Sequence, residues 1–178
     1  MSEEEPRAAL DCGAAALGFL IDLTRRAEYA IGAAEARAIV SQLPSEAVVT
    51  HLRDPERVAD LSASVGVRTI QVHDDMIIPD LRRLRVLAPG TRLLKSVHVT
   101  GEDVLGRALS YAAAPDATAL DCRTADRLGG TGLTHDWSIS ARIVEVVAPL
   151  PVYLAWGAAA RERGRGDCAG APGRPRWT

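Results

Sequence analysis

Six short apolar segments recur along the chain, and they constrain its fold more than any other feature. Between them lie segments in which apolar residues recur every three or four positions, the spacing of an amphipathic helix. Strands that alternate with helices favour a parallel sheet, because a parallel connection needs a long crossover. Strands of such a sheet are covered on both faces, which explains why these segments are almost continuously apolar. The segments are 15–21, 47–50, 67–72, 92–99, 117–121 and 150–155.

The intervening segments carry helix signals of their own. Asp54-Pro55 predicts a helix start, because an aspartate side chain caps free backbone N–H groups and proline suits the first helical turn. The other expected helices cover 33–43, 79–87, 101–113 and 138–147. Residues 1–157 are therefore predicted to form a single α/β domain. The sequence 158–178 is rich in Gly, Arg, Ala and Pro, and we expect it to be a disordered tail.

Composition excludes several classes of partner. The 178 residues suffice for one domain with a core, and a formal net charge of −2 gives no electrostatic reason to expect nucleic acid. Cys12, Cys122 and Cys168 share no metal-ligand spacing and suit a reducing compartment. The N-terminus lacks the apolar core of a signal peptide, and no apolar run reaches membrane-spanning length. We therefore expect a cytoplasmic protein with no metal site and no membrane partner.

A glycine-rich loop follows the fifth apolar segment, which ends in Asp121. The loop reads Gly129-Gly130-Thr131-Gly132. A carboxylate at the carboxyl end of a parallel strand can face a substrate, and backbone N–H groups of a glycine loop can approach anionic oxygens. Asp121 is therefore the candidate general acid. The alternative interpretations are that Asp121 caps the following loop and that the glycines only form a turn.

Four further polar residues are candidates for substrate binding. Gln71 and His73 alternate with apolar residues, so their side chains lie on one face near the end of the third segment. Lys95 interrupts a run that is otherwise buried, so it pairs, extends to the surface or points into an active-site mouth. Arg26 follows Arg25 beyond the first segment and can bind an anion. The structural alternatives are a buried, hydrogen-bonded histidine and two solvated arginines.

Taken in order, these motifs resemble the phosphoribosylanthranilate isomerase family of tryptophan biosynthesis, which has a (β/α)8 TIM-barrel fold. Ile70-Gln71-Val72-His73 is similar to that family's fourth-strand motif, and Leu94-Lys95-Ser96-Val97 is similar to its fifth. Leu120-Asp121-Cys122, the loop 129–132 and Asp136-Trp137 resemble its sixth strand and loop. Gly13–Phe19 and Pro151–Ala155 resemble its second and seventh strands, so the resemblance runs from about residue 6 to residue 157.

The resemblance implies an Amadori rearrangement of N-(5′-phosphoribosyl)anthranilate that needs no cofactor. A general acid protonates the furanose ring oxygen as the ring opens, and a base then removes the C2′ proton. By the family's pattern Asp121 is the general acid. The residues expected to bind the small phosphosugar substrate are Arg26, Gln71, His73, Lys95, Gly129, Gly130, Thr131 and Gly132.

Two stretches depart from the family's pattern. Family members begin with a strand ending in Lys-Ile-Cys-Gly, whose cysteine is the general base, whereas Cys12 directly precedes the segment similar to the second strand. After the seventh strand the family has Gly-Gly-Leu and an eighth strand ending in Ser-Gly-Val-Glu, where this chain has Trp156-Gly157 and the tail. We therefore expect an incomplete barrel of about six parallel strands, without the first and eighth, and an impaired isomerase.

Three interpretations of such a chain remain open. It is an isomerase shortened by truncation or a reading-frame shift, or a noncatalytic relative that binds a phosphosugar. Alternatively, it is a partial barrel that another chain completes. A sheet with open edges also predicts self-association, because unpaired strand edges pair readily with a second chain.

Overall fold

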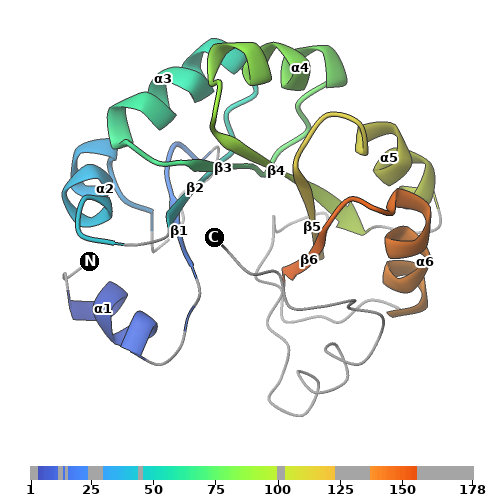
Figure 1. Cartoon of the computed structure of the whole chain (residues 1–178), viewed down its shortest axis with the longest axis horizontal. Helices are drawn as coiled ribbons and strands as arrows, with labels where there is room; N and C mark the ends of the chain where they lie inside the picture. Colours follow the sequence, from blue (N-terminus) through green and yellow to red (C-terminus); the bar gives the residue numbers. More distant parts are fainter. Residues whose placement is uncertain are drawn as a thin grey trace. The chain divides into compact units, whose positions relative to one another are not determined.

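The structure is a computed structural model, and it describes residues 4–11, 14, 16–23, 30–43, 46–99, 103–122 and 137–155. Helices alternate with strands along the described chain (Figure 1). The helices are α1 (Glu4–Asp11), α2 (Ala33–Val40), α3 (Pro55–Val65), α4 (Ile78–Leu87), α5 (Val104–Tyr111) and α6 (Trp137–Val147). The strands are β1 (Leu17–Leu20), β2 (Glu46–Thr50), β3 (Thr69–Val72), β4 (Arg92–Val99), β5 (Ala117–Cys122) and β6 (Val152–Ala155).

The six described strands belong to one sheet and follow one another in sequence order. Pairing is parallel between β1 and β2, between β2 and β3, and between β5 and β6. At the start of β4 the Arg92 N–H donates to the Arg68 carbonyl at 2.8 Å. A helix lies between each pair of successive strands in the chain. The predicted α/β fold with about six parallel strands in sequential order is therefore confirmed.

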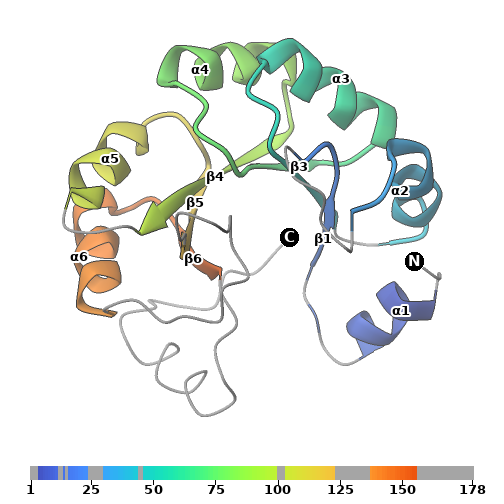
Figure 2. The same cartoon turned by 180° about the vertical axis from the view of Figure 1, so that it is seen from behind.

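The chain divides into two compact units, residues 1–94 and 95–178, and the division falls inside β4. In the first unit α2, α3 and α4 cover one face of the strands (Figures 1 and 2). The contact of α2 and α3 with β1 and β2 buries one apolar cluster, which accounts for the apolar strand residues on that face. The cluster consists of Phe19, Ile21, Ala36, Ile39, Val40, Val48, Leu61, Val65 and Val67.

In the second unit α5 and α6 pack beside each other and cover one face of β4, β5 and β6 (Figure 2). The apolar residues that fill this layer come alternately from the strands and from the helices. They are Val97, Val99, Val104, Ala108, Leu120, Ile143 and Val147. Because side chains alternate along a strand, this cluster also fixes which strand residues lie on the opposite face.

Helix α3 is specified at both of its ends. The Asp54 side chain accepts a hydrogen bond from the Arg57 N–H at 2.9 Å, and Pro55 opens the first turn, as predicted. At the other end Gly66 has a φ of 85°, and its N–H donates to the Ser62 carbonyl. A left-handed residue is a common way to end a helix, and glycine adopts it without steric cost.

Several predictions concern residues outside the described part of the chain. They are those made for Cys12, Arg26, the glycine loop 129–132 and the tail 158–178.

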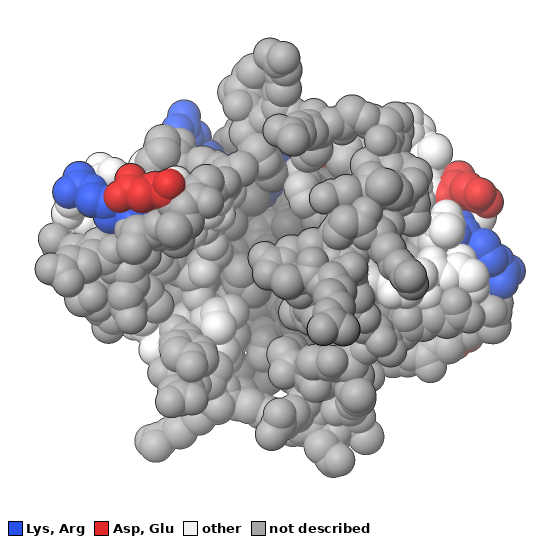
Figure 3. All heavy atoms as spheres, turned by 90° about the horizontal axis from the view of Figure 1, so that it is seen from below, with Lys and Arg blue, Asp and Glu red and all other residues white. Residues whose placement is uncertain are grey.

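Figure 3 shows described side chains of both charges close to one another on the face that it presents. No helix in the described ranges has the length and apolar character needed to cross a membrane.

Candidate active site

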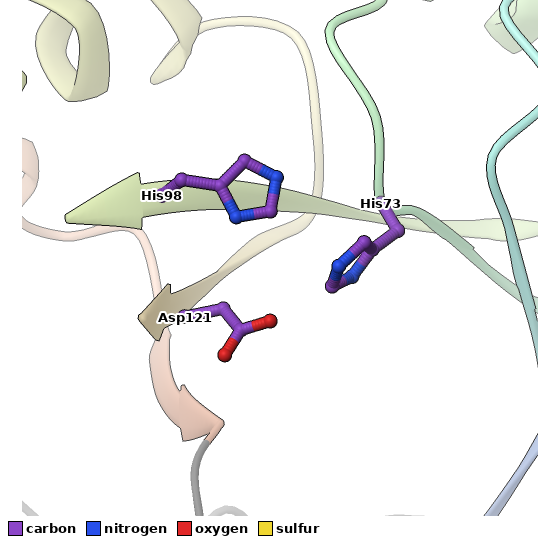
Figure 4. A group of neighbouring side chains, drawn as sticks. All are labelled: His73, His98 and Asp121. Carbon is purple, nitrogen blue, oxygen red and sulfur yellow. The ribbon is translucent and has the colours of Figure 1, made fainter. Parts of the chain in front are cut away.

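Asp121 lies near the carboxyl end of β5, and His98 lies near the carboxyl end of β4 (Figure 4). A ring nitrogen of His98 and a carboxylate oxygen of Asp121 are within 4.8 Å of each other. Both side chains are buried, with exposed fractions of 1% and 4%. This pair therefore places a carboxyl group and an imidazole, the two side chains used most for proton transfer, in one sheltered site.

The alternation of side chains explains why these two residues share a face. Val97 and Val99 of β4 and Leu120 of β5 belong to the cluster under the helices. His98 and Asp121 are the neighbours of these residues in the chain, so they lie on the opposite face of the sheet. Carboxyl ends of parallel strands carry the active sites of barrel enzymes. The position expected for Asp121 at the carboxyl end of its strand agrees with this geometry.

Lys95 occupies a different place from the one expected at an active-site mouth. It alternates with Val97, so it lies on the helix side of β4, and it is fully buried. Its Nζ lies 5.0 Å from the ring centroid of Tyr111 in α5 and donates to the Ser96 carbonyl. A cation over an aromatic face is stabilised by the ring's negative charge density. This position does not support the substrate contact predicted for Lys95.

In the first unit His73 directly follows β3, and it does not stand alone. Val49 of β2 is paired in register with Gln71 of β3, so the residues two positions further on, His51 and His73, become neighbours. Their rings are stacked, with centroids 5.0 Å apart and an interplanar angle of 18°. Both are buried. The predicted strand-end location of His73 and the shared face of Gln71 and His73 agree with this register.

Asp74 extends this cluster with a buried carboxylate. Its Oδ2 accepts from Nε and Nη2 of Arg53 at 3.0 and 2.8 Å, and its Oδ1 accepts from the Asp75 N–H at 2.8 Å. Burial by itself raises the pKa of Asp74. The hydrogen bonds from Asp75 and Arg53, with the charges of Arg53 and His51, outweigh it and hold that pKa below its usual value. Asp74 is thus a fixed anion beside the two histidines.

Sequence reasoning missed His51, Asp74 and His98, although a signal for them was present. Each lies at or just beyond the carboxyl end of a parallel strand and is at most 7% exposed. Motif matching passes over them, because they lie outside the residues that carry the family resemblance. Applying the alternation rule to every strand end, with a search for buried polar residues, would have identified all three.

Comparison with known proteins adds independent evidence. No family model matches the chain. It is 35% identical to N-(5′-phosphoribosyl)anthranilate isomerase 2 of Methanosarcina mazei, over 86% of this chain and 70% of that relative. It is 36% identical to N-(5′-phosphoribosyl)anthranilate isomerase of Methanocella arvoryzae, over 85% of this chain and 73% of the relative. The chain belongs to the phosphoribosylanthranilate isomerase family. The resemblance read from its motifs is therefore confirmed.

Solved structures of phosphoribosylanthranilate isomerases share the fold. The structure from Thermus thermophilus matches with a TM-score of 0.76 at 19% identity, covering 95% of this chain and 79% of that one. The structure from Thermotoga maritima matches with a TM-score of 0.68 at 24% identity, covering 86% and 83%. The TM-scores confirm the TIM-barrel-type fold predicted for this member of the phosphoribosylanthranilate isomerase family.

Proposed function

We propose that this chain catalyses the isomerisation of N-(5′-phosphoribosyl)anthranilate in tryptophan biosynthesis, with Asp121 as the general acid. The observation that carries this proposal is the buried carboxyl group of Asp121 at the carboxyl end of β5. Membership of the isomerase family supports the reaction class. The Leu-Asp motif at this strand end supports the role of the residue.

The reaction needs a proton donor at the furanose ring oxygen. As the ring opens, Asp121 gives its proton to that oxygen, and the C1′–O bond breaks while the nitrogen lone pair forms a C1′=N bond. A buried site favours this transfer, because exclusion of water keeps the donor next to one acceptor only. The step leaves a carboxylate on Asp121 and a positive charge on the C1′=N nitrogen, and its efficiency depends on the position of the carboxyl group at the ring oxygen.

We propose that Gln71 and His73 contact the phosphosugar substrate. They lie at and just beyond the end of β3, on one face, and an imidazole there can donate to a sugar hydroxyl or a phosphate oxygen. A related isomerase has been solved with reduced 1-(o-carboxyphenylamino)-1-deoxyribulose 5-phosphate, which carries both a phosphate and a carboxylate. Arg26 and the loop 129–132 are proposed to bind these anions, by the family's pattern.

We also propose that the protein works in the cytoplasm, which is a reducing compartment. The three cysteines support this, because they share no disulfide-like or metal-like spacing.

The test compares Asp121→Asn with the native chain in a fluorescence assay of phosphoribosylanthranilate turnover. Loss of the general acid is expected to lower kcat by about 10²–10⁴-fold. Asp116→Asn is the matched control, because Asp116 is exposed and lies just before the same strand. Binding of the reduced deoxyribulose 5-phosphate compound is measured in parallel. Full turnover by Asp121→Asn would contradict the assignment, whereas binding without turnover by the native chain would indicate a noncatalytic phosphosugar-binding protein.

A further inference from the structure

A histidine ring turns readily about its last side-chain bond, so a fixed backbone alone does not set the direction of its hydrogen bonds. The two nitrogens donate and accept in the plane of the ring. His73, proposed above to contact the substrate, therefore needs a neighbour that fixes its plane. His51 is that neighbour, because the two rings are stacked with centroids 5.0 Å apart and an interplanar angle of 18°.

We propose that His51 is a positioning residue, which fixes the plane of the His73 imidazole for hydrogen bonding to the phosphosugar. In this role His51 acts on the substrate through His73. The inference rests on the function proposed above and adds a second layer of residues to the binding site.

The backbone at the ends of β2 and β3 brings the two rings together. The carbonyl of Thr50, the last residue of β2, accepts the His73 N–H at 2.9 Å, which extends the strand pairing one residue beyond β3. The Thr50 hydroxyl oxygen accepts the Leu52 N–H at 3.2 Å, so hydrogen bonds hold the chain on both sides of His51. Because side chains alternate along a strand, His51 and His73 share the face opposite Val48, which packs under the helices.

The Asp74 carboxylate completes the support of the ring pair. It is 2% exposed, and Arg53 and the Asp75 N–H hold it in place through three hydrogen bonds. The carboxylate and the His51 imidazole are close enough to interact electrostatically, since the charge of His51 helps to lower the pKa of Asp74. A carboxylate in a fixed position attracts an imidazole N–H, and so restrains the ring that stacks on His73.

Burial makes this stack effective in binding. His51 and His73 are 7% and 8% exposed. An offset-stacked ring pair is stabilised beyond the area that it buries. Holding a side chain in its bound conformation before the ligand arrives lowers the entropy cost of binding. The contribution of His51 is therefore expected in the affinity for the substrate, with little effect on the chemical step.

The experiment compares His51→Leu with His51→Phe. Both variants lose the polar atoms of the imidazole, but only phenylalanine keeps a flat ring beside His73. We expect His51→Leu to raise KM, and the Kd of the reduced deoxyribulose 5-phosphate compound, by about 3–10-fold, the range of one stacked contact. We expect kcat to change by less than about twofold, because the contact acts equally before and in the transition state. His51→Phe should recover most of the lost affinity.

Phe19→Leu is the matched control. Phe19 is also a buried ring of the first unit, 4% exposed, but it belongs to the cluster under the helices. Its loss should lower the urea midpoint of unfolding and leave KM and Kd at their native values. If His51 only supported the fold, His51→Leu would behave like this control. Circular dichroism of each protein checks that the fold is retained.

A double-mutant cycle tests whether His51 acts through His73. His73→Ala removes the proposed contact with the substrate. In that background His51→Leu should raise the Kd by less than about 1.5-fold, because residues that act as one unit are not additive. Equal effects of His51→Leu in both backgrounds would show that His51 acts independently of His73, and would overturn the positioning role.

The results separate this inference from the proposed function. Native affinity of His51→Leu, or equal losses in His51→Leu and His51→Phe, would overturn the role of His51 and leave the isomerase assignment standing. Native affinity of His73→Ala would overturn the contact of His73, and this inference with it. A native chain that binds the compound without turnover would overturn the proposed function alone, because the Kd still reports on His51. A native chain that neither binds nor turns over would overturn both.

Discussion

At the scale of single residues, the ends of the strands carry buried polar groups whose charge is fixed by their neighbours. Asp74 illustrates how this works, because its carboxylate receives three hydrogen bonds while it is 2% exposed. A buried anion without such donors is costly, and with them it becomes a rigid support for adjacent side chains. His51 and His73 are stacked directly beside it in the same unit.

Asp74→Asn is predicted to lower the free energy of unfolding at pH 7 by about 1–2 kcal/mol, a modest value because Arg53 stays in solvent. The folded-state pKa of Asp74 lies below its ordinary 3.8. The carboxylate therefore stabilises the fold above that value, and this contribution disappears as the pH falls through the folded-state pKa. Urea unfolding of both proteins between pH 7 and pH 3 should show the difference shrinking on acidification. Asp75→Asn, a change at the exposed neighbour, is the control and should show no comparable difference.

Glu46 presents the opposite case at the start of β2. It is 7% exposed and its Oε2 has no hydrogen-bond partner. Burial raises the pKa of Glu46 above 4.5, although the charge and the backbone N–H of Arg68 act in the other direction. The protonated form is thus favoured in the folded state. The contribution of this group to stability is greatest at low pH and is lost as the pH rises through the folded-state pKa.

The stability of Glu46→Gln relative to the native chain is therefore predicted to increase as the pH rises. The difference in unfolding free energy between the two proteins should move in favour of the variant from pH 4 to pH 7, because glutamine carries no charge to desolvate. Chemical denaturation at a series of pH values measures it. A difference that stays constant over this range would show that the Glu46 carboxyl is not perturbed by burial.

The candidate site could be predicted only in part at this scale. Asp121 and His73 were found because they belong to motifs with a known order along the chain. His98 was not, because it lies outside those motifs, and only the alternation of side chains along β4 distinguishes it. The packing of Val97 and Val99 under the helices places His98 on the opposite face of the sheet. For Lys95 the sequence left three alternatives open, namely pairing, extension to the surface and an active-site mouth, and the structure shows a buried ammonium over the Tyr111 ring.

At the scale of elements, turn and cap residues are the sequence features that predict the ends of helices most reliably. Asp54-Pro55 predicted the start of α3, and the structure confirms both the cap and the proline position. Helix α1, in contrast, was not predicted from the sequence. The third apolar segment begins earlier than β3, because Val67 still donates its N–H to the Ser62 carbonyl as α3 ends.

Two glycines allow the conformational requirement of a helix end to be measured. A Cβ added at Gly66 or at Gly106 meets no atom within 4 Å, so packing is the same at both sites. Only Gly66 has a positive φ, of 85°. Gly66→Ala is predicted to lower the free energy of unfolding by about 1–2 kcal/mol. Gly106→Ala, inside α5, is predicted to raise it by about 0.5–1 kcal/mol. Equal effects in thermal or urea unfolding would contradict this account of Gly66.

At the scale of the whole molecule, sequence order and spatial order coincide. Each of the six strands lies in the sheet in the order in which it occurs in the chain, as the alternation of strands and helices predicted. This regularity explains why a resemblance built from motifs in a fixed order identified the family correctly. Motif order and strand order carry the same information in a barrel-type fold.

The ends of this sheet lead to the last prediction, which concerns self-association. Among the described strands, β1 and β6 are the outermost, and Leu154 of β6 is 40% exposed. Outer strands present backbone groups and apolar side chains that pair readily with another chain. Sedimentation velocity over about 1–100 µM is therefore predicted to show a size that increases with concentration.

Leu154→Lys should weaken this association, because a charge at a strand edge opposes pairing. Leu109→Lys is the matched control, since Leu109 is exposed on α5 and away from the strand edge. Equal association of both variants, or a native chain whose size does not change with concentration, would rule out the strand edge as the contact.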